Sequence, residues 1–233
     1  MKFHAPLIHG VLVQRYKRFL ADVTLDDGTE ITAQVANPGS MLGMKDPGME
    51  VWLSPAANPK RKLKYSWELA NVEGALIGVN TGHPNKVGEE AILEGRIPEL
   101  SGYEQLKREV KYGENSRIDI LLSNPDDPSL CYVEIKSVTL RRGDKAQFPD
   151  SVTARGTKHL NELGDMAEQG HRAVMLYLVQ RQDCASFSIA DDIDPAYAKA
   201  LQTALSRGVE VLCYTCVITT EEICVSKPLK IAI

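Results

Sequence analysis

Residues 117–138 constrain the fold more than any other part of this chain. They read RIDILL, SNPDDPS and LCYVEIKSV in turn, so two runs of β-branched and aliphatic residues flank a turn-rich connector. This pattern predicts a β-hairpin, because Pro, Asn, Asp and Ser supply the dihedral angles and local caps of tight connections. A loop that closes symmetrically about Asp126 and Asp127 places Leu122 opposite Cys131, and Asp119 opposite Glu134.

The same register predicts two different faces, since successive strand residues point to opposite sides. Paired strand residues have Cβ atoms about 5 Å apart, so Asp119 and Glu134 would repel each other unless a cation lay between them. The apolar face comprises Ile118, Ile120, Leu122, Cys131, Val133 and Ile135, and the polar face comprises Arg117, Asp119, Glu134 and Lys136.

We therefore expect a divalent cation, Mg²⁺ or Mn²⁺, held by Asp119, Glu134 and the backbone carbonyl of Ile135. Such ions bind through one or two carboxylates and substrate phosphates, and they activate a bound water for hydrolysis. Lys136 would then assist the attacking water. The alternative is a solvated strand face, in which Arg117 or Lys136 neutralises the acids as weak surface ion pairs.

Length and composition are those of an ordinary globular protein. The chain has 233 residues, of which 43% are hydrophobic and 25% are charged, enough for two domains with apolar cores. No apolar run approaches the roughly 20 residues of a membrane span, and the N-terminus lacks a signal-peptide core, so we expect a cytoplasmic protein with no membrane partner. The net charge of −4 argues against coating nucleic acid by bulk electrostatics.

The cysteines do not indicate a secreted disulfide framework, because they number five and are irregularly spaced. Cys213 and Cys216 form a C-x-x-C within the strand-like residues 209–218. Strand residues three apart face opposite sides, so we expect two buried strand cysteines rather than a zinc or redox site.

Residues 1–82 are predicted to form an OB-like β-barrel. Short β-like runs alternate there with Gly, Pro and Asp turns, as in small closed barrels that bind oligonucleotides. Basic residues interleave with Tyr65 and Trp67, which predicts nucleic-acid contact by Lys60, Arg61, Lys62 and Lys64. The alternative is a solvated charged run with both aromatics in the barrel core.

Residues 83–233 are predicted to form an α/β domain with a mixed sheet flanked by helices. A helix is expected over residues 84–97, from which Glu90 could reach the metal site as a further ligand. A second helix opens near residue 156, and the cations Arg155, Lys158 and His159 at its start could bind phosphate. His159 could equally be a structural histidine at a polar rim.

The chain resembles the sugar fermentation stimulation protein A family, and its second half resembles the PD-(D/E)XK nuclease core. This resemblance rests on NT at 80–81, SGY at 101–103, EVKYG at 109–113, SRID at 116–119, VEIKSVTL at 133–140 and FPDSVTARGTKHL at 148–160. It implies a bacterial protein with an OB-like domain, a nuclease-like domain and non-specific DNA binding. Asp119, Glu134 and Lys136 match the nuclease motif. One departure is VANPGS at 35–40, where the family pattern has Cys-Pro-Asn.

Two functions are consistent with these patterns. The first is a metal-dependent nuclease that hydrolyses phosphodiesters of DNA, or alternatively of RNA. The second, implied by the resemblance, is a non-specific DNA-binding regulator of sugar (maltose) metabolism without turnover. A homodimer is compatible with both, since the helical stripes do not distinguish intramolecular packing from a dimer contact.

Overall fold

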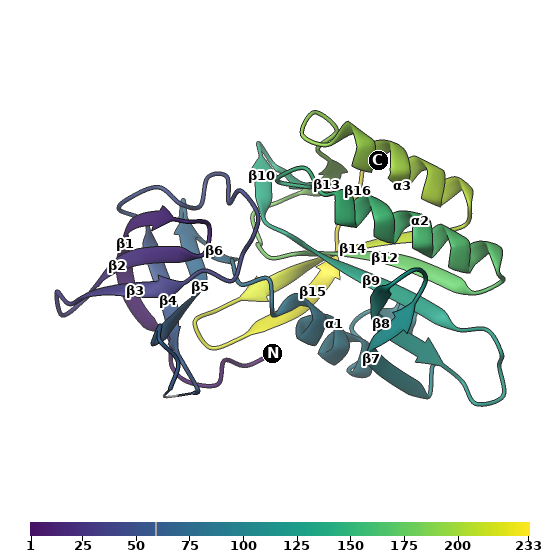
Figure 1. The fold of residues 1–233 in the computed structure, drawn as a ribbon, viewed down its shortest axis with the longest axis horizontal. Coiled ribbons are helices and arrows are strands. Elements are labelled where there is room, and N and C mark those ends of the chain that lie inside the picture. The colour runs from purple at the N-terminus through teal and green to yellow at the C-terminus, as the bar shows by residue number, and fades with distance from the viewer. Residues whose placement is uncertain (59) are drawn as a thin grey trace.

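The computed structural model describes residues 1–58 and 60–233, and its N-terminal half is a β-barrel (Figure 1). The strands follow the order β3-β2-β1-β4-β5-β6, and a parallel contact between Gln34 and Ser66 joins β3 to β5 and closes the barrel. Trp67, which is fully buried, packs inside the barrel with aliphatic side chains. The strands are β1 (Ile8–Tyr16), β2 (Leu20–Leu25), β3 (Glu30–Gln34), β4 (Glu50–Pro55), β5 (Tyr65–Val72) and β6 (Ala75–Gly78). The predicted OB-like barrel is thus confirmed.

The second half is a mixed α/β domain, as predicted. Its main sheet has the order β15-β14-β12-β9-β8-β7, with β9, β12 and β14 parallel to one another and β7 and β8 antiparallel. The small sheet has the order β10-β11-β13-β16. The strands are β7 (Gln105–Tyr112), β8 (Ser116–Ser123), β9 (Cys131–Val138), β10 (Leu140–Arg142), β11 (Lys145–Phe148), β12 (Arg172–Val179), β13 (Ser186–Ile189), β14 (Glu210–Ile218), β15 (Ile223–Pro228) and β16 (Lys230–Ile231).

Helices cover both faces of the main sheet (Figure 1). On one face α1 (Pro84–Leu93) buries Val87 and Ala91, whereas α2 (Ala154–Glu168) and α3 (Pro195–Ser206) bury Leu160 and Leu201 on the other. The first helix ends earlier than the sequence predicts. Gly95 adopts a left-handed φ of +69°, and a short 3₁₀ turn, Pro98–Leu100, follows.

The predicted hairpin register is present in β8 and β9. Leu122 pairs with Cys131, but the ladder ends at the pair of Ile120 and Val133, and the two strands separate beyond it. One predicted neighbour is misplaced, because Ile118 packs in the core under α2 and α3 rather than with Ile120. This difference accompanies an irregularity in β7, whose pairing with β8 skips Glu109 at a φ of +53°.

The C-x-x-C cysteines lie on opposite faces of β14, as predicted. Cys213 belongs to the core under α2 and α3, and Cys216 belongs to the core under α1. All five cysteines are free thiols. Among the described residues, no helix has both the length and the apolar composition that a membrane crossing requires.

The N-terminal residues pack against the second half of the chain rather than the barrel. Met1 is buried in the core under α1, and Lys2 forms a β-bridge with Glu222. The barrel strands begin only at Ile8, so the chain crosses from one domain to the other twice.

Candidate active site in the cleft between the domains

A cleft of about 950 Å³ lies between the barrel and the α/β domain. The barrel contributes Arg15, Arg18 and the loop of residues 37–40, while the other side is formed by β9, residues 147–153 and the start of α2. The Ser40 hydroxyl donates a hydrogen bond to the Asp150 backbone carbonyl (2.6 Å), and the Met41 N–H donates to Asp150 Oδ2 (3.1 Å). The two sides of the cleft are therefore joined directly.

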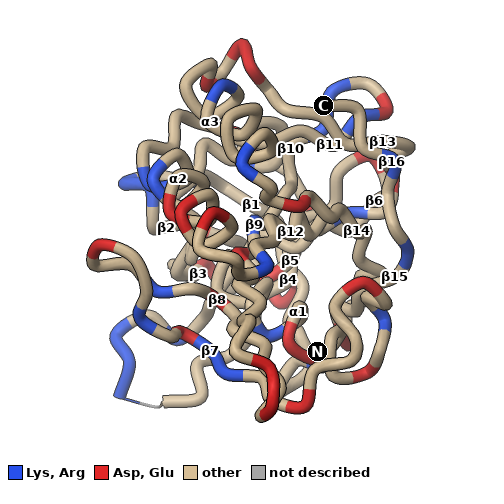
Figure 2. Tube along the Cα trace, turned by 90° about the vertical axis from the view of Figure 1, so that its right-hand side faces the viewer, with Lys and Arg blue, Asp and Glu red and all other residues tan. Residues whose placement is uncertain are grey.

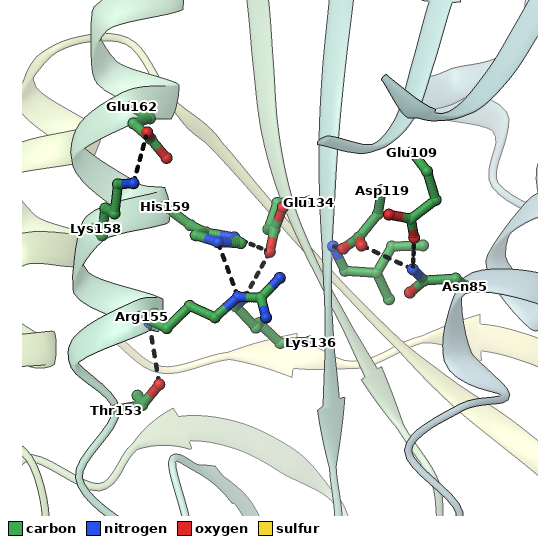
Figure 3. A network of polar contacts seen from close by, with 12 residues as sticks. Asn85, Glu109, Asp119, Glu134, Lys136, Thr153, Arg155, Lys158, His159 and Glu162 are labelled. Atoms are coloured by element: carbon green, nitrogen blue, oxygen red, sulfur yellow. Dashed lines mark hydrogen bonds and ion pairs between the residues drawn. The ribbon is translucent and has the colours of Figure 1, made fainter. Parts of the chain in front are cut away.

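Asp119 lies in this cleft where β8 and β9 separate. Its Oδ2 accepts a hydrogen bond from the Ile135 N–H (2.7 Å). The carboxylate therefore accepts the bond that a backbone carbonyl of β8 would accept if the ladder continued. Its Oδ1 accepts from the side-chain amide of Asn85 (2.7 Å), in the first turn of α1 (Figure 3). Since N–H and C=O of one strand residue point to the same side, the Ile135 carbonyl also faces the gap beside Asp119.

Glu134 is 2% exposed, and its two carboxylate oxygens differ. Oε1 accepts hydrogen bonds from Lys136 Nζ (2.7 Å) and from His159 Nδ1 on α2. Oε2 has no hydrogen-bond partner among the described residues. A buried acceptor without a partner is costly. Oε2 is thus the one oxygen of this group that a ligand could satisfy.

His159 is held by contacts at both ring nitrogens. Arg155 Nε lies 3.2 Å from Nε2, and Nδ1 contacts Glu134 Oε1 (Figure 3). His159 therefore orients the carboxylate, and Arg155 orients the ring. The side chain is buried rather than placed at a polar rim.

Burial and mutual repulsion act differently on the two acids. Burial, together with the nearby charge of Glu134, raises the pKa of Asp119 to about 6. Burial would also raise the pKa of Glu134, but the charge of Lys136 and the contacts of His159 outweigh it and lower that pKa below its usual range. As in the alternative of a solvated strand face, Lys136 pairs with Glu134, but the Glu134 side chain is buried rather than solvated, while Asp119 is partly exposed in the cleft.

These residues fit a divalent cation of the Mg²⁺ type. Within residues 1–58 and 60–233, no three His, Cys, Asp or Glu side chains group closely enough to hold a metal alone. Mg²⁺ does not require three, because it binds through one or two carboxylates and keeps waters or substrate oxygens. Asp119, the unpartnered Glu134 Oε2 and the Ile135 carbonyl supply oxygen ligands of that kind.

The structure does not bring every predicted site residue to the cleft. Glu90 forms an ion pair with the N-terminal ammonium group (2.7 Å) and lines a different pocket. Lys60, Arg61, Lys62 and Lys64 lie on the β4–β5 connection, outside the cleft lining, and Figure 2 shows this basic loop projecting at the lower left. The Arg61 guanidinium donates to the Leu63 and Tyr65 carbonyls, so it organises its own loop.

The predicted cations of α2 divide into two groups. Arg155 and His159 line the cleft, as do Asp119, Glu134, Ile135 and Lys136. Lys158 points elsewhere, donating to the Glu114 carbonyl and lying 3.6 Å from Glu162 (Figure 3).

Sequence reasoning did not find Asn85 or Asp150, whereas Arg18 lies in the run RYKRF at 15–19, whose alternating basic and aromatic residues are a pattern that can contact phosphates and stack on bases. Asn85 follows the Gly-His-Pro turn that opens α1, which is the only sequence signal for its place. Asp150 enters the cleft through the packing of two domains, which no local pattern predicts.

Comparisons with known proteins agree along the whole chain. The family model of the sugar fermentation stimulation protein RE domain matches residues 82–222, and that of the N-terminal OB domain matches residues 13–79. A sugar fermentation stimulation protein homolog of Paramagnetospirillum magneticum is 59% identical over 98% of this chain and 97% of its own. The homolog of Rhodospirillum centenum is 57% identical over 100% of both chains. The solved structure of Pyrococcus furiosus SfsA in complex with Ca²⁺ is 28% identical, with a TM-score of 0.90 over 100% of this chain and 98% of that chain.

Proposed function

This chain belongs to the sugar fermentation stimulation protein family, and from that premise we propose that its interdomain cleft binds nucleic acid and hydrolyses phosphodiester bonds with a divalent cation. One observation carries the proposal. The buried Glu134 and the partly buried Asp119 face a cation-lined cleft, and one carboxylate oxygen of Glu134 has no partner among the described residues.

Each residue around the pair would have a separate role in hydrolysis. Asp119, Glu134 and the Ile135 carbonyl would hold the ion, which polarises the phosphoryl oxygens and acidifies a bound water. Lys136 places a positive charge beside Glu134 (2.7 Å), where it can stabilise the attacking hydroxide. His159 and Arg155 keep the Glu134 carboxylate in one orientation. Mg²⁺ and Mn²⁺ are the expected ions, since all the ligands are oxygens.

The Pyrococcus furiosus relative supports the choice of ion class. That structure is a complex with Ca²⁺, a hard cation that also takes oxygen ligands. Because that protein and this chain share a fold over their full lengths, a divalent cation is a reasonable partner for the same acids here.

The test is cleavage by a Glu134→Gln variant. The amide keeps the shape of the side chain but removes the charge that the ion and Lys136 share. We expect cleavage of DNA or RNA in Mn²⁺ to fall by at least about 100-fold, because losing a metal ligand should cost no less than losing a residue that only orients one. Duplex binding in chelator should be retained. Glu90→Gln is the matched control, because Glu90 lies in another pocket, and it should cleave like the wild type. Unchanged cleavage by Glu134→Gln would contradict the proposal.

One observation favours a second function, a non-specific DNA-binding regulator of sugar (maltose) metabolism without turnover. Lys136 neutralises Glu134, and His159 contacts the same carboxylate oxygen, so the pair does not depend wholly on an ion. This function predicts salt-sensitive DNA retention with no product in Mg²⁺ or Mn²⁺. Wild-type incubations with single- and double-stranded DNA and RNA therefore separate the two.

A further inference from the structure

The turn between β1 and β2 has an unusual backbone. Tyr16 pairs with Leu20, so the three residues Lys17, Arg18 and Phe19 make the connection. Lys17 and Arg18 both have positive φ, at +46° and +63°, and the Phe19 N–H donates to the Lys17 carbonyl (2.7 Å). Such a turn centred on a left-handed residue is rare and strained, and hairpins normally use Gly or Asn at positive φ. Strain of this kind concentrates at functional sites.

Arg15 fixes the turn against the side of the cleft. Its guanidinium donates to the Arg18 carbonyl (2.8 Å), to the Asn37 carbonyl (2.9 Å) and to the Ser40 carbonyl (3.3 Å). The Val35 N–H also donates to the Phe19 carbonyl (2.9 Å). The strained turn is therefore held in one place relative to the acid pair.

The three side chains of this turn are exposed to solvent. Arg18 lines the cleft, and no ion pair or side-chain hydrogen bond engages Lys17 or Arg18 within the described part of the chain. Burial, and to a smaller extent the adjacent Arg18 charge, lower the pKa of Arg15 against the opposing charge of Asp150. Phe19 is 48% exposed and has no aromatic partner among the described rings. Two cations without a counter-charge beside an exposed ring are the side chains that can contact a phosphate and an unstacked base.

We propose that this turn binds single-stranded nucleic acid, with Phe19 stacking on a base and Arg18 contacting the phosphate that leads to Asp119 and Glu134. The assignment rests on the proposed function, and it names the substrate form of the same cleft. An aromatic ring of this kind serves an unstacked base, whereas duplex bases are already stacked. Arg18 lines the cleft of about 950 Å³, and Phe19 follows it in the chain at the edge of the lining.

The experiment measures binding in chelator, without turnover, by fluorescence anisotropy. The probes are a labelled oligothymidylate and a duplex of the same length. Phe19→Ala should weaken single-strand binding about tenfold and leave duplex binding unchanged, while Phe19→Tyr should restore it and Phe19→Leu should not. Arg18→Ala should weaken single-strand binding and lower the slope of log affinity against log salt by about one.

Val13→Ala is the matched control, because Val13 is an apolar residue of the same barrel with a similar exposed fraction, 44% against 48%, and it lies within β1 rather than in the turn. It should bind the oligothymidylate like the wild type. Unchanged single-strand binding by Phe19→Ala, or an equal loss for duplex, would overturn the assignment. A wild-type protein that cleaves nothing would contradict the hydrolase proposal alone, because these measurements do not depend on cleavage.

Discussion

At the scale of single residues, two buried tyrosines differ in how their hydroxyl groups are satisfied. The Tyr177 hydroxyl lies 2.6 Å from that of Tyr197, whereas the Tyr112 hydroxyl has no partner among the described residues. A buried hydroxyl without a partner costs stability, and a satisfied one contributes about 1 kcal/mol. Tyr177→Phe should therefore lower the free energy of unfolding by about 1 kcal/mol, and Tyr112→Phe should leave it unchanged or raise it.

Urea denaturation of both variants and the wild type checks this. The paired design matters because both substitutions remove one oxygen from a buried ring. If Tyr112→Phe lost as much stability as Tyr177→Phe, the Tyr112 hydroxyl would have a partner in solution.

How far the sequence predicts the site depends on where each residue comes from. Asp119, Glu134 and Lys136 were predictable, because one hairpin brings them together and strand periodicity is local. His159 was predictable only as a cation, and its role in orienting Glu134 required the packing of α2 on β9. Glu90 lies away from the site, because the sequence does not show which face of a helix points toward a site before the packing of the helix is known.

At the scale of elements, the turn between β1 and β2 allows a direct test of backbone strain. Lys17 has a φ of +46°, a conformation that costs a side-chain-bearing residue about 1–2 kcal/mol and costs glycine almost nothing. Glycine loses part of that gain through its freedom in the unfolded chain. We expect Lys17→Gly to raise the free energy of unfolding by about 0.5–1 kcal/mol.

Thermal and urea unfolding measure the change, and Lys111→Gly on β7 serves as the control. Lys111 is also an exposed lysine, but it lies in a strand and its φ is not positive, so glycine there should destabilise the protein by about 0.5–1 kcal/mol. A loss of stability in Lys17→Gly would show that the turn is not strained.

Elements were more predictable than their ends and distortions. The barrel strands and the hairpin follow from alternation and turn residues, which act over a few neighbours. α1 ends near the left-handed Gly95, and Ile118 enters the other core next to the missing pair of Glu109 and Asp119 in the β7–β8 ladder. Neither can be read from periodicity alone, because both arise where neighbouring strands and helices meet.

At the scale of the whole molecule, the cleft exists because direct contacts fix the position of one domain relative to the other. Asp150 accepts hydrogen bonds from the barrel loop, the Gly78 N–H donates to the Gln180 carbonyl (3.0 Å), and Arg141 pairs with Glu73 (3.1 Å). These contacts join residues distant in sequence, so the cleft could not be predicted from either half alone. They also imply that changes at the domain junction should affect the stability of the whole protein.

Glu68 is the buried acid at that junction and gives the junction a pH dependence. It lies on β5 and accepts hydrogen bonds from Ser54, from Asn80 (2.8 Å) and from His83, which precedes α1 (2.7 Å). Burial alone would raise the pKa of Glu68, but the contacts of His83, Ser54 and Asn80 outweigh burial and lower it. A carboxylate with a lowered folded-state pKa adds stability above its unfolded pKa of about 4.3.

That contribution is lost as the pH falls through the folded-state pKa. We therefore expect Glu68→Gln to be less stable than the wild type by on the order of 2 kcal/mol at pH 7, the size of a charged hydrogen bond. The difference should shrink below about pH 4.3, because protonation gives the wild-type acid the same neutral state as the amide. Glu73→Gln, an exposed acid of the same barrel, should show no such trend, since its ion pair with Arg141 is at the surface. Urea unfolding at a series of pH values measures both variants, and a deficit of Glu68→Gln that stayed constant to low pH would show that shape, rather than charge, holds the two domains together.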